Sequence, residues 1–353
     1  MYDVRNIGPN IRVNSKKLIN LCSNDYLGIK SPKISRKQNQ SSSRLIAGND
    51  ESFKILESKL AKHKSQDSAL IFPTGYMANL GVISSLIQKN DHVYSDEFNH
   101  ASLIEACKMT GAKITIFNHN NMSDLNSKIK ADSKRKFIIT EGIFSMDGDC
   151  ADLKIISEIS QKYNAITILD DAHGDFTIGK NGGGSANYFG VGKKIDVYTS
   201  SLSKGLGSFG GYIASQKNVI DISINKSKSF IYTSALPSLF IDDAIKRFDS
   251  DRETRRKLLW ENTNYFSTGL KKIGYRNESK SHIIPIMIGK EKHAIEFAIY
   301  LRKNGIFVHP IRYPTVPKNN ARIRISITAS LTKKQMKFSL DVFDKARKKF
   351  QIE

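Results

Sequence analysis

One lysine of this chain lies in a setting that favours covalent chemistry. Lys204 follows an apolar run and is surrounded by hydroxyls and glycines in residues 200–207, Ser-Ser-Leu-Ser-Lys-Gly-Leu-Gly. Partial burial among small residues helps an amine to lose its proton and to form a Schiff base with an aldehyde cofactor. The hydroxyls of Ser201 and Ser203 can hold a phosphate, and the glycines allow the backbone to approach it closely. The alternative is an ordinary Lys-Gly turn.

An acid and an imidazole end another apolar run. Residues 165–173 read Ala-Ile-Thr-Ile-Leu-Asp-Asp-Ala-His, and polar groups at the carboxyl end of a buried strand lie where open α/β sheets bind ligands. Asp170 suits a charge-assisted hydrogen bond to the protonated pyridine nitrogen that makes pyridoxal phosphate (PLP) an electron sink. His173 is placed to reach the phenolic oxygen of that cofactor. The alternative is an Asx turn with a surface histidine.

Two further segments offer groups that suit the same cofactor. His100 follows the apolar run 92–95, and a neutral imidazole there can stack on a pyridine ring, although histidines at strand ends are also structural. Residues 72–79, Phe-Pro-Thr-Gly-Tyr-Met-Ala-Asn, form a turn that leads into an apolar helix. The first backbone amides of such a helix point at an anion if one is bound. The alternative is an ordinary helix start.

Taken together, these segments resemble the α-oxoamine synthases, a family of fold-type-I PLP enzymes. The resemblance covers nearly the whole chain and includes residues 21–28, 140–149 and 231–234. It implies an α/β fold with a mainly parallel seven-stranded sheet in a large PLP-binding domain. A smaller α+β C-terminal domain is also implied. One departure is the segment 39–42, Asn-Gln-Ser-Ser, which stands where the family has a glycine-rich segment.

The resemblance also implies the roles of the residues around the cofactor ring. Lys204 would hold PLP and would remove the Cα proton of the amino-acid substrate. Asp170 would bind the ring nitrogen, and His100 would stack on the ring. Ser145 and His173 would lie on either side of the phenolic oxygen.

The phosphate of the cofactor has its own implied set of residues. Gly75, Tyr76 and Ser201 would hold it from the same chain. Ser234 would reach it from the neighbouring subunit, so the resemblance implies a homodimer with a shared active site.

Substrate binding is assigned to four further positions of the chain. Arg324 is the candidate for an amino-acid carboxylate, because a planar guanidinium binds a carboxylate through two hydrogen bonds. Arg322 lies on the same side of the predicted strand, so a surface arginine is the alternative. Arg312 is the candidate for the acyl substrate. Asn24 and Glu141 are carried over as residues that line the site, with a turn or a structural acceptor as alternatives.

Residues 311–317 and 321–329 favour one branch of the family. That branch condenses L-alanine with a pimeloyl thioester of coenzyme A or acyl carrier protein. The decarboxylative, PLP-dependent reaction gives 8-amino-7-oxononanoate, CO2 and the free thiol carrier in biotin biosynthesis. A sister activity such as glycine C-acetyltransferase is the alternative. A basic binding protein without catalysis is a more distant one.

The composition limits the partners. The 353 residues include 55 Lys and Arg against 34 Asp and Glu, a formal net charge of +21. No nucleic-acid motif accompanies the dispersed basic residues, so a solvated surface or an anionic acyl carrier explains them better than nucleic acid. No apolar run approaches the ~20 residues needed to span a bilayer. Three scattered cysteines predict no metal cluster and a reducing cytoplasm.

The order of apolar and amphipathic segments predicts the organisation of the chain. We expect an N-terminal arm at 1–30, a large domain at 31–236 and a small domain at 237–353. A helix is expected after Asp50, and one charged helix over about 242–270. The last apolar run directly follows a glycine-rich turn, so we expect it to be the antiparallel strand of the fold family that the chain resembles. The seven runs that predict strands are 69–72, 92–95, 114–117, 137–140, 166–169, 197–200 and 212–214.

Overall fold

The computed structural model describes residues 4–34, 42–132 and 134–352. The chain divides into two compact units. The small unit comprises Met1–Gly28, Ser145–Asp149 and Glu253–Glu353, and the large unit comprises Ile29–Phe144 and Cys150–Arg252. The domain boundaries expected from the sequence stay a prediction. The atypical residues 39–41 lie outside the described residues.

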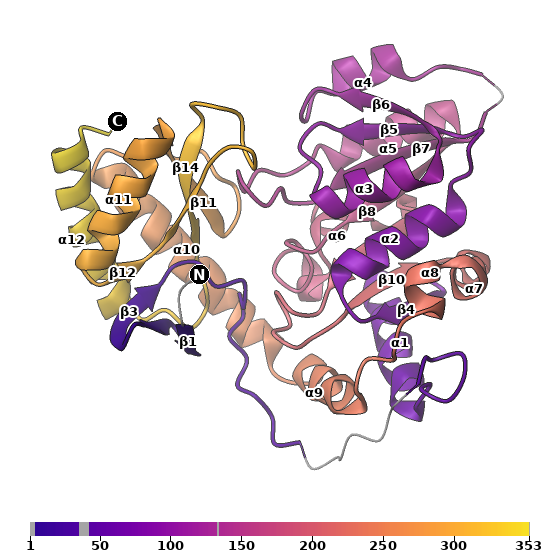
Figure 1. The fold of residues 1–353 in the computed structure, drawn as a ribbon, viewed down its shortest axis with the longest axis horizontal. Coiled ribbons are helices and arrows are strands. Elements are labelled where there is room, and N and C mark those ends of the chain that lie inside the picture. The colour runs from indigo at the N-terminus through magenta and orange to yellow at the C-terminus, as the bar shows by residue number, and fades with distance from the viewer. Residues whose placement is uncertain (1–3, 35–41, 133, 353) are drawn as a thin grey trace. The chain divides into compact units, whose positions relative to one another are not determined.

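The large unit is built on one sheet of seven strands in the order β4-β10-β9-β8-β7-β5-β6 (Figure 1). β10 is antiparallel to both of its neighbours, and the other pairs are parallel. The mainly parallel sheet and its antiparallel strand confirm the predicted fold class. The strands are β4 (Ser68–Phe72), β5 (His92–Asp96), β6 (Lys113–Phe117), β7 (Lys136–Glu141), β8 (Ala165–Asp170), β9 (Val197–Ser201) and β10 (Gly211–Ser215).

Helices cover this sheet because its strands are apolar on both sides. Every residue of β5, β7, β9 and β10 is buried, whereas the edge strand β6 is partly exposed. One core joins α2, α3, α7 and α8 to the sheet, with Val82 and Leu103 against Phe137 and Ile213. The helices of the unit are α1 (Glu51–Lys64), α2 (Gly75–Leu86), α3 (Ala101–Thr110), α4 (Met122–Lys128), α5 (Leu153–Tyr163), α6 (Ser185–Tyr188), α7 (Lys217–Lys226), α8 (Lys228–Ile231) and α9 (Ser238–Phe248).

Two of the helix predictions can be compared with the structure. The carboxylate of Asp50 accepts a hydrogen bond from the amide of Ser52 and caps α1, as predicted. The single charged helix over 242–270 is wrong, because α9 ends at Phe248 and α10 (Arg252–Lys272) begins after a break. In the break, the Ser250 hydroxyl donates to the carbonyl of Arg247 at 2.6 Å. Such side-chain bonds to the backbone compete with a continuous helix.

The small unit holds two further sheets. In one, β1 (Val4–Ile7), β2 (Asn10–Val13) and β3 (Lys16–Asn20) are antiparallel, and β12 (Ile306–Phe307) pairs parallel with β3. These N-terminal strands were not predicted. The remaining elements are β11 (Ile283–Gly289), β13 (His309–Ile311) and β14 (Ala321–Ser326), which form the other sheet in the order β11-β14-β13, and the helices α10, α11 (Glu291–Lys303) and α12 (Lys333–Phe350).

Candidate active site

Lys204 and His173 meet at the carboxyl edge of the large sheet. β8 and β9 are parallel neighbours, so the turns that follow them leave the sheet side by side. Lys204 lies in the turn after β9, and its Nζ is 2.9 Å from Nε2 of His173. His173 is buried, whereas Lys204 is partly exposed. The amine is therefore accessible and is held by an imidazole.

Asp170, the last residue of β8, is a buried carboxylate with two hydrogen-bond donors. Its Oδ2 accepts from Nδ2 of Asn79 on α2 at 2.7 Å, and its Oδ1 accepts from the amide of Ala172 at 3.0 Å. The two donors fix the orientation of the Asp170 carboxyl group at the strand end.

The same network continues to His100. Nδ2 of Asn79 also donates to Oγ of Ser102 at 2.9 Å, and Oγ of Ser102 is 2.8 Å from Nδ1 of His100. The amide of Ser102 donates to Nδ1 at 3.2 Å, so His100 is the side chain that caps α3. A ring nitrogen that accepts a hydrogen bond belongs to a neutral imidazole.

The charge state of His100 follows from its surroundings. Burial of the imidazole lowers the pKa of His100; the nearby Asp170 carboxylate opposes this, and Lys204 adds to it. His100 is therefore neutral at neutral pH. A neutral ring is what stacking on a protonated pyridine requires, because two cationic rings would repel each other.

The start of α2 packs closely against the end of β9. Thr74 caps α2 by accepting from the amide of Met77, which leaves the first amides of the helix facing outward. A Cβ at Gly75 would lie 3.2 Å from Cβ of Ser201, so the two segments approach as closely as a glycine allows. Oγ of Ser201 is 2.8 Å from Oγ of Ser203. Amides at a helix N-terminus and hydroxyls are suitable donors for a phosphate.

The donors and acceptors of the large unit fit PLP. An accessible amine, a buried carboxylate, a neutral imidazole and a helix N-terminus with hydroxyls match its aldehyde, ring nitrogen, ring face and phosphate. The structure brings together Lys204, His173, Asp170, His100 and the pair Gly75 and Ser201. The Tyr76 side chain is half-exposed and donates from its hydroxyl to Glu105. Its amide remains the group available to an anion.

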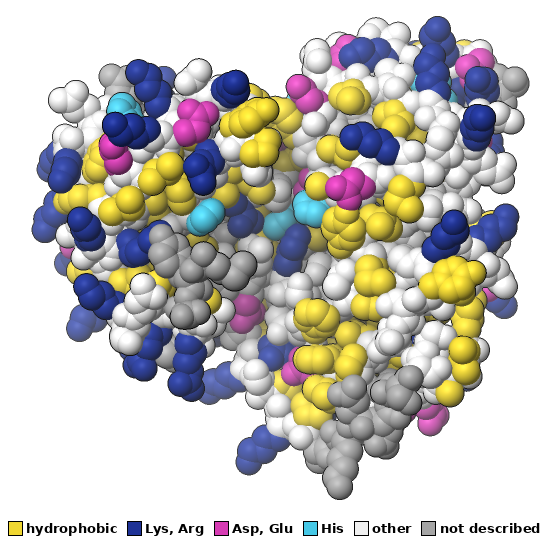
Figure 2. Space-filling model, viewed as in Figure 1, with side chains coloured by type: hydrophobic (Ala, Val, Ile, Leu, Met, Phe, Trp, Pro, Cys, Tyr) yellow, Lys and Arg dark blue, Asp and Glu magenta, His cyan; other side chains and the backbone are white. Residues whose placement is uncertain are grey.

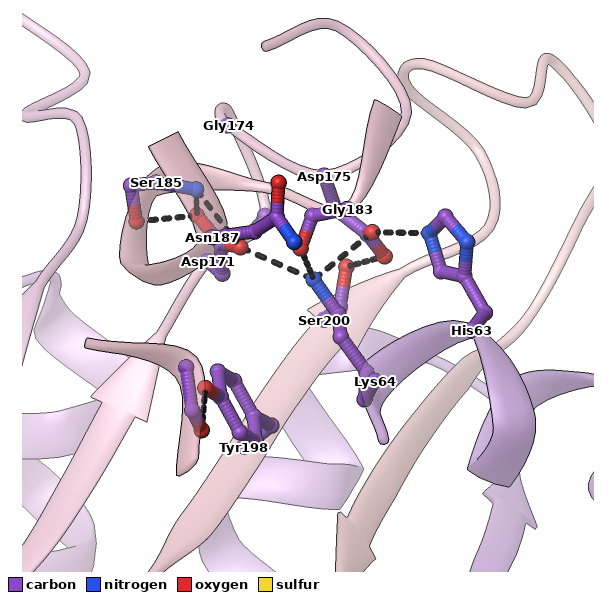
Figure 3. Close-up of polar contacts among 12 residues, drawn as sticks. His63, Lys64, Asp171, Gly174, Asp175, Gly183, Ser185, Asn187, Tyr198 and Ser200 are labelled. Atoms are coloured by element: carbon purple, nitrogen blue, oxygen red, sulfur yellow. Dashed lines mark hydrogen bonds and ion pairs between the residues drawn. The ribbon is translucent and has the colours of Figure 1, made fainter. Parts of the chain in front are cut away.

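A buried ion network holds the loop after β8, which carries His173 (Figure 3). Nζ of Lys64 lies 2.8 Å from Oδ2 of Asp171 and 2.8 Å from Oδ1 of Asp175, and all three side chains are fully buried. The carbonyl of Gly183 accepts from the same amine at 3.2 Å. Nε2 of His63 contacts Oδ1 of Asp175 at 2.9 Å. Lys64 thus fixes both ends of the segment 171–175, in which His173 lies.

Hydroxyl groups complete this network on both carboxylates. Ser200 on β9 donates to Oδ2 of Asp175 at 2.7 Å, and Tyr212 on β10 donates to the same oxygen at 2.5 Å. Oγ of Ser185 donates to Asp171 at 2.6 Å. Burial alone would raise the pKa of Asp175, but Lys64 and His63 outweigh it and hold that pKa below its usual range. A protonated lysine and an ionised aspartate therefore stay paired in the interior.

The small unit brings together three of the other predicted residues. Nη1 of Arg324 donates to Oδ1 of Asn24 at 3.2 Å, and Nη2 donates to the hydroxyl of Tyr26 at 3.3 Å. The carbonyl of Ser145 accepts from Nε of Arg324. Arg322, two residues earlier on β14, is buried and paired with Asp147. The two arginines thus differ, since Arg324 is partly exposed and has neutral partners.

Three predicted residues lie outside these groups. Arg312 follows β13 and is exposed, and Ser234 is exposed in the segment after α8. Glu141 is buried at the end of β7, next to Asp170. In the described part of the chain no cluster of three or more His, Cys, Asp or Glu side chains is arranged to hold a metal ion. None of its helices has the length and apolar character of a membrane span.

Sequence reasoning did not assign roles to Asn79, Ser102 or Lys64. Asn79 lies in the first turns of α2, where an asparagine side chain is unfavourable unless it bonds elsewhere. The sequence signal that could have identified Asn79 is a polar residue within an otherwise apolar helix. Lys64 gave no such signal, because a lysine in the last turn of a helix is normally exposed and interacts with the helix dipole.

Comparisons with known proteins agree with this geometry. Residues 16–343 match the family model described as aminotransferase class I and II. An 8-amino-7-oxononanoate synthase of Thermoanaerobacter pseudethanolicus is 38% identical over 363 residues, covering 98% of this chain and 91% of the relative.

Two solved structures extend the likeness to three dimensions. One is the 8-amino-7-oxononanoate synthase of Francisella tularensis, with a TM-score of 0.81 and 27% identity over 95% of this chain and 99% of that chain. The other is a serine palmitoyltransferase variant from S. paucimobilis with bound PLP-myriocin. It has a TM-score of 0.94 and 26% identity over 99% of this chain and 92% of that chain.

Proposed function

Since this chain belongs to the aminotransferase class I and II family, we propose that it is a PLP-dependent acyltransferase that condenses L-alanine with a pimeloyl thioester. The carrier of the thioester is coenzyme A or acyl carrier protein. The products are 8-amino-7-oxononanoate, CO2 and the free thiol carrier, as in biotin biosynthesis. The relatives confirm the resemblance of the sequence to the α-oxoamine synthases.

One observation of the structure carries the proposed chemistry. The Lys204 amine lies 2.9 Å from Nε2 of His173, at the sheet edge where Asp170 ends β8. An amine that has to bind an aldehyde and then act as a base requires a neighbour that can accept its proton. The choice of alanine and of the pimeloyl group is supported by the names of the relatives.

The residues of the large unit would act in turn on the bound cofactor and substrate. When bound, PLP delocalises the electrons that remain at the substrate Cα once its proton has left. Lys204 would take that proton, with His173 next to it. The Asp170 carboxylate would hold the ring nitrogen through a charge-assisted hydrogen bond, and neutral His100 would stack on the ring. Gly75, Tyr76 and Ser201 would bind the phosphate.

The residues of the small unit would bind the substrates. Arg324 would hold the alanine carboxylate until it leaves as CO2, because its guanidinium offers several N–H groups in one plane. Asn24 already contacts Arg324 and would orient it. Arg312 would contact the acyl group or its carrier. Ser145 would bond the phenolic oxygen of PLP.

Lysine-directed labelling tests the central residue of the proposal. Borohydride reduction of the PLP-loaded protein, followed by peptide mapping, should place the label on Lys204. The Lys204→Ala variant should lose both the label and turnover, whereas Lys62→Ala, which alters an exposed lysine, should keep both. A label on any other lysine of the wild-type protein contradicts the proposal.

Steady-state kinetics separates this function from its sister activity. Alanine with a pimeloyl thioester should give a higher kcat/KM than glycine with an acetyl thioester. The reverse preference would assign the protein to the glycine C-acetyltransferase activity and would leave the role of Lys204 unchanged.

The basic surface is consistent with an anionic acyl carrier. Figure 2 shows Lys and Arg side chains dispersed over the visible face of each unit, interspersed with acidic ones. Such a surface attracts anionic coenzymes and acidic carrier proteins over a distance. A homodimer and a cytoplasmic location remain parts of the proposal.

A further inference from the structure

Two carboxylic acids lie side by side at the carboxyl ends of two neighbouring strands in the middle of the large sheet. Glu141 ends β7 and Asp170 ends β8, and the two residues are directly paired in the parallel register. Paired residues of neighbouring strands point to the same face and are about 5 Å apart. Glu141 is 3% exposed and Asp170 is 7% exposed. Two negative charges at this distance without water repel strongly.

The carboxyl group of Asp170 has more hydrogen-bond donors than that of Glu141. Asp170 accepts from Nδ2 of Asn79 and from the amide of Ala172. Oε1 of Glu141 has no hydrogen-bond partner among the described residues, and the backbone amide of His100 donates to this carboxyl group. Donors stabilise a carboxylate, so the negative charge is better placed on Asp170.

The charges that face Glu141 from the neighbouring elements support the same assignment. Burial raises the pKa of Glu141 well above its ordinary range, and the charge of Asp170 raises it further. Lys204 opposes this shift, and Asp96 at the end of β5 adds to it. Two acids and one lysine thus surround the carboxyl group.

We propose that Glu141 carries the proton of this carboxyl pair in the folded protein and thereby keeps Asp170 ionised. Glu141 is then a positioning residue that acts through Asp170. The use of an ionised Asp170 to hold the ring nitrogen of PLP rests on the proposed function. The protonation of Glu141 itself does not, because it follows from the burial of the two acids and from their hydrogen-bond donors.

The pH dependence of unfolding tests this inference on the full-length protein. The raised pKa means that the contribution of Glu141 to stability is fully present below the ordinary pKa of glutamate. It is lost progressively as the pH rises through the raised value, because the unfolded chain releases a proton that the folded chain retains. Glu141→Gln keeps the shape and a neutral group, and it cannot ionise.

The ratio of the wild-type to the Glu141→Gln unfolding constant should therefore rise about tenfold per pH unit above the ordinary glutamate range. It should level off where folded Glu141 ionises. A ratio that stays constant between about pH 5 and pH 8 means that Glu141 is already ionised in the folded state, and it overturns the proposal.

A second background tests whether Glu141 acts on Asp170. In Asp170→Asn protein the neighbouring charge is gone, so the pKa of Glu141 should fall. The ratio of the two unfolding constants should then level off at a lower pH than in the wild-type background. If the ratio levels off at the same pH in both backgrounds, Asp170 does not affect the pKa of Glu141.

A spectroscopic readout covers the case in which a variant fails to fold. In wild-type protein labelled at the glutamate side-chain carboxyl carbon, one 13C resonance should stay at the protonated position near pH 7. Glutamates that have all ionised by that pH would overturn the inference. Both readouts are independent of turnover, so a failure of the proposed reaction would leave them unaffected.

Discussion

At the scale of single residues, the chemistry of the large unit depends on which groups are charged. Asp170 has two donors, while His100 accepts at Nδ1 and is neutral. Lys204 has an imidazole within 2.9 Å. A carboxyl group with fixed donors and a neutral imidazole are the contacts that a protonated pyridine ring needs.

The two arginines of β14 allow a prediction about carboxylate binding. Arg324→Lys should raise the KM for alanine by roughly ten- to hundredfold, because a lysine loses the paired hydrogen bonds, worth about 1.5–3 kcal/mol to a charged group. Initial-rate kinetics over a range of alanine concentrations measures the effect. A KM unchanged from wild type would show that Arg324 does not bind the carboxylate.

Arg322→Lys is the matched control for this measurement. Its guanidinium is buried and paired with Asp147, so the substitution should lower thermal stability. The KM for alanine of the folded fraction should stay near the wild-type value.

At the scale of elements, strand ends and helix starts create the site. β8 and β9 deliver Asp170 and the turn with Lys204 to one edge, and α2 begins at the same edge. Parallel strands always present their carboxyl ends together, which is why residues 30 or more positions apart can meet there. The loops that follow β8 and β9 therefore start close together and need only be held in position.

Gly75 tests the contact between α2 and β9. Gly75→Ala should lower PLP affinity roughly tenfold, because a methyl group 3.2 Å from Cβ of Ser201 forces the helix start away from the strand. Gly192→Ala is the control, since nothing lies closer than 3.7 Å to its added Cβ. PLP titrations followed by absorbance compare the two. Equal PLP affinities of the two variants would show that the start of α2 does not bind the phosphate.

Lys64 tests the network that holds the loop after β8. Lys64→Met should destabilise the protein by about 3–5 kcal/mol, because two buried carboxylates lose their cation. Urea denaturation measures the free energy of unfolding. Lys62→Met alters an exposed lysine of the same helix and should change it by less than about 0.5 kcal/mol. Equal effects of the two substitutions would contradict a structural role of the ion network.

These elements also show what the sequence could predict. All seven strands of the large sheet lie where apolar runs are found, because strands that pack against covering helices are rich in apolar residues. The cap at Asp50 was recognisable because its partner is local. The pairing of β3 with β12 was not, because it joins residues 19 and 306 and depends on the whole fold.

The candidate site divides in the same way. Lys204, Asp170 and His173 were predicted from strand ends and residue chemistry. Asn79 and Ser102, which connect Asp170 to His100, were not assigned, because the connection needs two helices placed in three dimensions. The burial of Lys64 likewise depends on partners more than 100 positions away.

At the scale of the whole molecule, the large unit retains apolar side chains at its surface. Ile46 is 82% exposed and Tyr232 is 81% exposed, and Met109 is 62% exposed. Figure 2 shows further hydrophobic side chains among the charged ones. Surfaces that a second subunit covers expose apolar side chains in the single chain. The exposed side chains support the proposed homodimer.

Mixed dimers test whether two subunits share the site. Lys204→Ala removes the amine of its own subunit, and Ser234→Asp would place a negative charge against the phosphate bound by its partner. Dimers that contain one chain of each variant, purified through two different tags, keep one intact site. They should show about half of the wild-type activity, while each variant alone is nearly inactive. Inactive mixed dimers would mean that Ser234 serves its own subunit, because each chain would then carry its own defect.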